Sequence, residues 1–191
     1  MTFLNSFSAV TYLNGAAAEF VDAVRRHFTP GCPHKAHLTF LPPRPLFVPV
    51  DEAIRACREI LDDVPPFEIS LGEVELFEKT QVVKIGIGHG RADVIALHNR
   101  LSKGPFEFAE GYEYSPHITL LHQEAADLES VDRQKVATCL AMAQDRWNES
   151  PCSRRMVIDR VVFVQQSVDG YWVDLEKIPL GKFELQPVRR R

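Results

Sequence analysis

The chain carries one short pattern twice, a histidine followed two positions later by a threonine within an apolar run. The two copies are His37-Leu38-Thr39-Phe40 and His117-Ile118-Thr119-Leu120. Residues i and i+2 of a β-strand project from one face, so each copy presents an imidazole beside a hydroxyl while its apolar partners face the other way. We therefore expect two related strands that face each other and supply two histidines and two hydroxyls to one site.

The composition is that of an ordinary globular protein. Of the 191 residues, 45% are hydrophobic and 25% are charged, enough to bury a substantial core as one domain or two tightly joined lobes. The chain has no signal-peptide pattern at its start and no apolar run near 18 residues, so we expect a cytoplasmic protein without a membrane span. The cysteines form no C-x-x-C pair, which favours reduced and mostly buried thiols at Cys32, Cys57, Cys139 and Cys152.

The formal net charge of −4 argues against binding to a long duplex nucleic acid, whose affinity depends on the number of phosphates that a protein neutralises. A small anionic ligand in a locally positive site remains compatible with this charge. The single basic run is Arg189-Arg190-Arg191, which we interpret as an exposed tail.

Strand-like and helix-like periodicities alternate along the chain. Strands are predicted over 7–13, from 37, 67–76, 83–87, from 117, 157–165 and 171–178, and helices start near 17, 51, 94 and 130. Pro42, Pro43 and Pro45 predict an extended loop after the first tetrad. A change of phase after Gly72 predicts a β-bulge in the long strand.

The predicted order is β-α-β-α-β-β-α-β-α-β-β, with each tetrad strand between two helices and the tetrads 80 residues apart (117 minus 37). No linker separates the two related halves. We therefore predict one compact, bilobal α+β domain that spans residues 1–191.

With its two H-x-T tetrads, the whole chain resembles the 2H phosphoesterase superfamily, also called the LigT-like or 2′-5′ RNA ligase family. The resemblance implies a pseudo-twofold fold in which two antiparallel sheets line a central cleft and helices pack outside. It also implies a monomer that opens 2′,3′-cyclic phosphates of RNA ends or nucleotides, or processes related 2′-5′ phosphodiesters, without a metal or other cofactor.

Opening a cyclic phosphodiester requires a base for the incoming water and an acid for the departing ribose oxygen, and histidine can perform either task near neutral pH. We expect His37 and His117 to be catalytic, with His37 as the acid and His117 as the base. Thr39 and Thr119 would donate hydrogen bonds to the non-bridging phosphate oxygens.

The sequence departs from the family pattern where many relatives have an arginine or lysine shortly after the second tetrad. Here that position is His122, which lacks the bidentate fork of arginine. Lys35, which shares strand parity with His37, and Arg44 are the candidates that replace the missing positive charge.

Three aromatic residues near strands, Tyr114, Tyr171 and Trp172, could stack on a nucleobase or could pack at the edge of the core. The candidate substrate-binding residues are therefore Lys35, Arg44, His122, Tyr114 and Trp172.

Other site types fit less well. His34 with His37, or His117 with His122, would place the two side chains on opposite faces of a strand, so we expect no metal site. The glycine-rich stretch 86–90 misses the dinucleotide-binding spacing and is explained by a turn from a strand to a helix. The alternative function is a non-catalytic module that binds a nucleotide or an RNA end in the same cleft.

Overall fold

The computed structural model describes residues 2–123 and 128–181. In chain order the elements are β1 (Phe3–Tyr12), α1 (Gly15–Phe28), β2 (His37–Arg44), α2 (Val50–Leu61), β3 (Phe67–Phe77), β4 (Val82–Ile87), α3 (Arg91–Leu101), the 3-10 helix η1 (Gly104–Phe106), β5 (His117–Leu121), α4 (Arg133–Glu149), β6 (Arg155–Ile158), β7 (Arg160–Ser167) and β8 (Trp172–Pro179). The basic run of Arg189, Arg190 and Arg191 lies outside the described residues. Within them, no helix is both long enough and apolar enough to cross a membrane.

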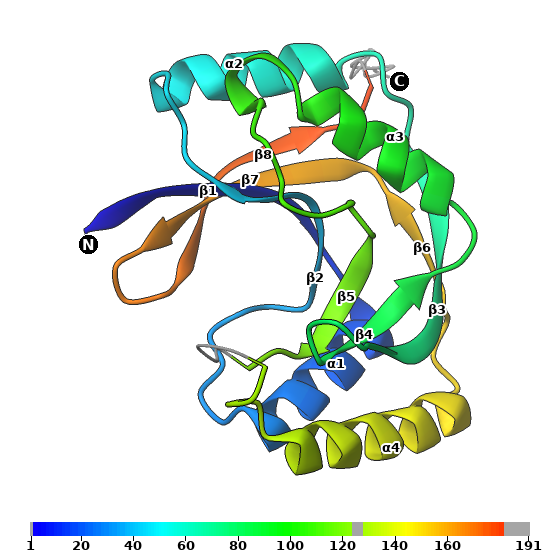
Figure 1. Cartoon of the computed structure of the whole chain (residues 1–191). Helices are drawn as coiled ribbons and strands as arrows, with labels where there is room; N and C mark the ends of the chain where they lie inside the picture. Colours follow the sequence, from blue (N-terminus) through cyan, green and yellow to red (C-terminus); the bar gives the residue numbers. More distant parts are fainter. Residues whose placement is uncertain (1, 124–127, 182–191) are drawn as a thin grey trace, which may run out of the picture.

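The described strands form two antiparallel sheets of four strands each (Figure 1). Sheet 1 has the order β2-β1-β7-β8 and sheet 2 has the order β5-β4-β3-β6. In these orders β2, β1, β7 and β8 correspond to β5, β4, β3 and β6, so each tetrad strand lies at the edge of its own sheet. This pseudo-twofold arrangement confirms the bilobal α+β class that the duplicated tetrads predict.

Each helix that leads into a tetrad strand packs on the opposite sheet. Helix α1 connects β1 to β2 but contacts β5 and α4, whereas α3 connects β4 to β5 but contacts β2 and α2. Figure 1 shows α2 and α3 beside sheet 1, and α1 and α4 beside sheet 2. The lobes are therefore interleaved, and each contains elements from both halves of the sequence.

The helices bury one face of each sheet. Helix α1 contributes Ala17, Val21, Val24 and Phe28 to the main core, as its spacing predicts. A second, smaller apolar cluster of Val10, Val162 and Val164 lies apart from this core, and Tyr12 and Trp172 pack against it. Because Ala9 is part of the main core and Val10 is not, the two clusters occupy opposite faces of β1.

Two local predictions from the sequence are wrong. Pro42 and Pro43 do not begin a loop but lie within β2, where they are tolerated because β2 is an edge strand with an irregular register. The strand predicted over 157–165 is two strands, since the chain leaves β6 of sheet 2 after Ile158 and enters β7 of sheet 1 at Arg160.

Two other predictions are confirmed. The register between β3 and β4 shifts between Leu71 and Val74, which places the bulge at Gly72 and Glu73. The glycine-rich stretch is a turn from β4 to α3, and Gly90 occupies the left-handed region there with φ of 75°.

Candidate active site

The two tetrad histidines are held in the same way. The Nδ1 atom of His37 lies 2.7 Å from the carbonyl oxygen of Lys35, and Nδ1 of His117 lies 2.7 Å from that of Ser115. A carbonyl can only accept, so Nδ1 carries the hydrogen in both rings and Nε2 of each neutral ring keeps a lone pair. Each partner is two residues before its histidine, and the repeated bond fixes two matched imidazoles with Nε2 available for proton transfer.

The environment of His37 favours its neutral form. The pKa of His37 is lowered to about 4, first by burial and then by the nearby charges of Arg25, His34 and His117, against the opposing bond to Lys35. Strand β2, which carries His37, and strand β5, which carries His117, belong to different sheets but contact each other.

The pKa of His117 is also lowered from its usual value, first by burial and then by the charges of Lys84 and His122, against the opposing bond to Ser115. The ring of Phe77 packs against the imidazole edge to face, with 5.1 Å between centroids. Both catalytic candidates are therefore neutral imidazoles at pH 7 in the free protein.

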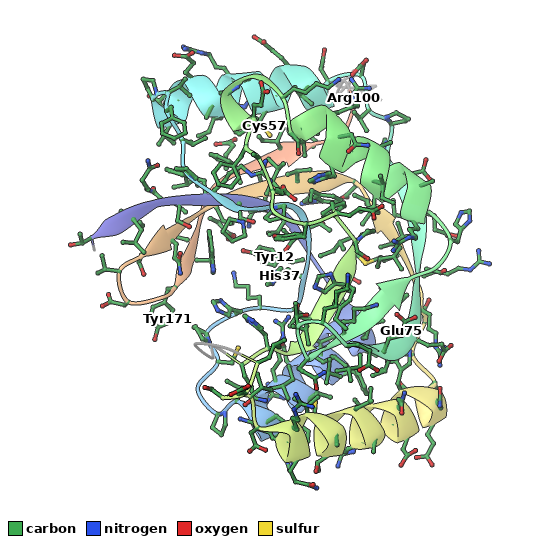
Figure 2. The ribbon with its side chains drawn as sticks, in the orientation of Figure 1. Tyr12, His37, Cys57, Glu75, Arg100 and Tyr171 are labelled. Atoms are coloured by element: carbon green, nitrogen blue, oxygen red, sulfur yellow. The ribbon has the colours of Figure 1, made fainter. Side chains whose placement is uncertain are left out.

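The face of sheet 1 that carries His37 is apolar. In register, His37 pairs with Tyr12 and Thr39 pairs with Val10, which places the imidazole and the hydroxyl on the face of the smaller apolar cluster. Trp172 packs against the same cluster. Figure 2 shows Tyr12 and His37 close together in the middle of the molecule, between the two sheets, and Tyr171 on the distant β7–β8 hairpin.

The matching face of sheet 2 carries a cation. Thr119 pairs with Lys84 and His117 pairs with Gly86, so Lys84 takes the place that Val10 has in sheet 1. The side chain of Lys84 is 8% exposed, forms an ion pair with Glu75, and lies 4.4 Å from the ring centroid of Phe77. Lys84 was not among the residues predicted from the sequence, although a lysine within the otherwise apolar strand Val82–Ile87 could have indicated it.

Two of the substrate-binding candidates, Lys35 and His122, lie near the tetrads. The ammonium of exposed Lys35 is 4.9 Å from the ring centroid of Tyr12, the residue that pairs with His37. Exposed His122 follows β5 and is close enough to lower the pKa of His117.

Two other candidates are engaged elsewhere. Arg44 lies at the far end of β2 from His37, and its buried guanidinium bonds to the carbonyls of Pro42 and Phe106 and to the carboxylate of Glu110. Arg44 therefore lies away from the histidines, and its charge is paired with Glu110 inside the protein.

Tyr114 stacks on His98 with 3.8 Å between ring centroids, and its hydroxyl donates to the carbonyl of Thr39 at 2.5 Å. This placement uses one ring face and the hydroxyl of Tyr114 within the protein. The stacking of Tyr114 on a nucleobase stays a prediction.

Among the described residues, no group of three or more His, Cys, Asp or Glu side chains is arranged to hold a metal ion. Of the cysteines, Cys57 and Cys139 are buried and Cys32 and Cys152 are partly buried, and all four are free thiols. Burial raises the pKa of both Cys57 and Cys139 to about 12, so these two are unreactive core residues.

The interleaved lobes, each with an H-x-T strand at its edge, define a protein of the 2H phosphoesterase class. The sequence model of the 2′-5′ RNA ligase superfamily matches residues 14–170, and the chain belongs to this family.

Individual relatives agree with this assignment. A Halalkalibacterium halodurans protein, whose name provisionally describes it as a phosphoesterase, is 26% identical over 159 residues, which cover 78% of this chain and 85% of that protein. The fold is similar to that of Escherichia coli LigT, with a TM-score of 0.61, 17% identity, and coverage of 93% of this chain and 98% of LigT. Kluyveromyces marxianus Usb1 gives a TM-score of 0.58 at 14% identity, with coverage of 93% and 98%. LigT has also been crystallised with 3′-AMP and with phosphate.

Proposed function

We propose that this protein is a phosphodiesterase that opens 2′,3′-cyclic phosphates of nucleotides or RNA ends, with His37 and His117 as its general acid and base. The observation that carries the proposal is the matched pair of imidazoles, each with Nδ1 bonded to a carbonyl, on strands β2 and β5, which contact each other across the two sheets. Two such rings on opposite sides of one phosphorus suit in-line displacement.

In the proposed reaction, one neutral imidazole takes a proton from water as the water oxygen attacks phosphorus. The bond from phosphorus to one ribose oxygen breaks, and the second imidazole, protonated, gives its proton to that oxygen. The product is a ribose monophosphate, and one proton has moved in effect between the two rings. The 3′-AMP bound to LigT is the kind of product that results when the 2′-oxygen leaves.

The two lobes offer different surfaces to such a substrate. On the face of sheet 2, Lys84 and the hydroxyl of Thr119 suit the negatively charged phosphate. On the face of sheet 1, the apolar cluster with Tyr12 and Trp172 suits the ribose and the base. We therefore propose that phosphate binds toward sheet 2 and the nucleoside toward sheet 1. Lys84 then supplies the charge that relatives place at the position of His122.

The environments also bear on which ring is the acid. Burial, and after it the charge of Arg25, opposes a charge on His37, whose pKa is about 4, so the neutral base is more readily His37. We propose His37 as the base and His117 as the acid, the reverse of the assignment made from the sequence. Binding of the anionic substrate beside His117 would further favour its protonated form.

The test is hydrolysis of a panel of 2′,3′-cyclic mononucleotides and a cyclic-ended oligonucleotide in the presence of EDTA, with the position of the product phosphate determined by phosphorus NMR. We expect His37→Ala and His117→Ala each to lose about 10²- to 10⁴-fold in kcat. His27→Ala, at an exposed histidine of α1, should match the wild type. A wild-type protein that binds 3′-AMP without turning over any cyclic phosphate would be a binding module instead.

A phosphodiester with a 4-nitrophenolate leaving group separates the acid from the base, since this group departs without a proton. On that substrate we expect His117→Ala to recover most of its lost rate relative to the wild type, and His37→Ala to remain slow. The opposite pattern would restore the assignment of His37 as the acid.

A further inference from the structure

Helices α1 and α3 are equivalent elements of the pseudo-twofold fold, and their buried faces correspond position by position. Helix α1 buries Val21, Val24, Arg25 and Phe28, and α3 buries Val94, Leu97, His98 and Leu101. Arg25 and His98 are therefore equivalent residues, each located three positions before the end of its helix. Both are polar side chains on an otherwise apolar face, and burial there is costly without hydrogen bonds.

Arg25 crosses from α1 to the second tetrad. Its Nε and Nη2 atoms donate to the carbonyl of Thr119, at 3.0 and 2.6 Å. Its Nη1 atom donates to the carbonyls of His34 and Lys35, at 3.2 and 2.9 Å. The Lys35 carbonyl is also the acceptor for Nδ1 of His37. One guanidinium thus joins the backbone of the second tetrad to the atom that orients the first histidine.

His98 makes the reciprocal connection from α3 to the first tetrad. Its Nδ1 atom lies 2.7 Å from the carbonyl of Phe40, so this nitrogen is the donor. The ring of Tyr114 stacks on the His98 imidazole, and the Tyr114 hydroxyl donates to the neighbouring carbonyl of Thr39. Each of the two helices therefore bonds to a carbonyl of the tetrad that it does not precede: α1 to Thr119 and α3 to Phe40.

We propose that Arg25 and His98, assisted by Tyr114, are positioning residues. Each connects the helix that precedes one tetrad to the strand of the other tetrad, and together these connections set the separation of the two imidazoles. This inference rests on the proposed two-histidine reaction. Acid and base must lie on opposite sides of one phosphorus, and an error of about 1 Å in such an arrangement costs about 100-fold in rate. Two strands in different sheets share no ladder that could hold them to this tolerance.

Polar residues that merely fill the core would not require these acceptors. A leucine at position 25 or 98 would continue the apolar face of either helix. Instead, Arg25 and His98 both bond to carbonyls of tetrad residues, at Thr119 and Phe40. Burial alone does not explain why each side chain bonds to the tetrad of the other helix, whereas a role in positioning the tetrads does.

The test compares Arg25→Met with Arg26→Met, which changes the exposed neighbour on the same turn, and His98→Leu with Asn99→Ala on α3. For Arg25→Met and His98→Leu we expect kcat on a 2′,3′-cyclic nucleotide to fall by about 10- to 100-fold with little change in KM. His98→Asn, which retains a donor near the place of Nδ1, should recover most of the rate. The two control variants should match the wild type.

Hydrogen–deuterium exchange of the free variants provides a readout that needs no substrate. We expect His98→Leu, on the helix before β5, to accelerate exchange in β2. We expect Arg25→Met, on the helix before β2, to accelerate exchange in β5. Variants that exchange faster only near the substitution, or that lose thermal stability while kcat stays within twofold of the wild type, would overturn the proposal. If the wild type is inactive but the variants show faster exchange in β2 and β5 as expected, the proposed reaction is wrong and the structural connections made by His98 and Arg25 stand.

Discussion

The two tetrad histidines have the same pattern and the same hydrogen bond, but their surroundings differ in kind. Arg25 is a buried cation beside His37 that bonds only to backbone carbonyls in the contacts described above. Lys84, beside His117, is paired with Glu75, whose side chain is 53% exposed. This asymmetry supports our proposal that Lys84 binds the phosphate in place of Glu75, whereas Arg25 has a structural role.

These charges predict the pH dependence of kcat/KM, which reports ionisations of the free enzyme. With His37 as the base, activity rises as pH increases through its pKa of about 4. With His117 as the acid, activity falls as pH increases through a pKa that lies below its usual value. We expect a bell-shaped profile with its maximum on the acidic side of pH 6.5, the usual pKa of histidine.

Lys84→Met should change one limb of that profile. Loss of the ammonium removes a charge that lowers the pKa of His117, so the alkaline limb shifts to higher pH and the acidic limb stays in place. Because Lys84 also holds the phosphate in our proposal, KM should rise about 10-fold or more. Lys79→Met, at an exposed lysine beyond β3, is the matched control. An unchanged alkaline limb would show that Lys84 does not act on His117.

Arg44 provides a test of a residue that the sequence assigned to the substrate and the structure assigns to the fold. Arg44→Met leaves the Glu110 carboxylate, 12% exposed, without its buried partner, and should lower the free energy of unfolding by about 3 kcal/mol. Arg58→Met, which breaks an exposed pair with Glu176, should cost less than about 1 kcal/mol. Urea unfolding measures both changes. If the Arg44→Met protein has normal stability and a raised KM, Arg44 binds the substrate as the sequence predicted.

At the scale of elements, local patterns predicted local features well. Strand parity correctly placed each tetrad histidine and threonine on one face, and the change of phase at Gly72 correctly located the bulge. The sequence could not predict that Arg44 meets Glu110, 66 residues away, or that Lys84 pairs with Thr119. Those contacts depend on strand register and on helix crossings between the lobes, which periodicity within one segment does not encode.

The start of α3 depends on a glycine that the sequence singled out only as part of a turn. At Gly90 φ is 75°, and an added Cβ would lie 2.4 Å from the carbonyl oxygen of Glu68. Gly90→Ala should therefore combine backbone strain with a clash against β3, and lower the free energy of unfolding by about 3 kcal/mol or more.

Gly104 is the matched control, because its φ is 59° and an added Cβ would meet no atom within 4 Å. Gly104→Ala should cost only the backbone strain, about 1 kcal/mol. Comparing the two variants by thermal and urea unfolding separates the backbone strain from the clash with Glu68. Equal losses would show that the approach of Glu68 to Gly90 has no energetic consequence.

At the scale of the whole molecule, the interleaved lobes bring neutral imidazoles together at a cost that depends on pH. His37 has a pKa of about 4 in the folded protein, and a histidine in an unfolded chain has a pKa of about 6.5. Between these values the unfolded chain binds more protons than the folded one, so the free energy of unfolding rises with pH. Above pH 6.5 the stabilisation is fully present, and it is lost as pH falls toward 4.

We expect urea unfolding to give a free energy about 2 kcal/mol lower at pH 4.5 than at pH 7 from His37 alone. His37→Asn keeps a donor for the Lys35 carbonyl but does not titrate in this range, so it should remove most of that dependence. His27→Asn, at an exposed histidine, should leave the dependence unchanged. If His37→Asn has the same pH dependence as the wild type, the imidazole is not held neutral by the fold. The acidic limb of the activity profile would then need another origin.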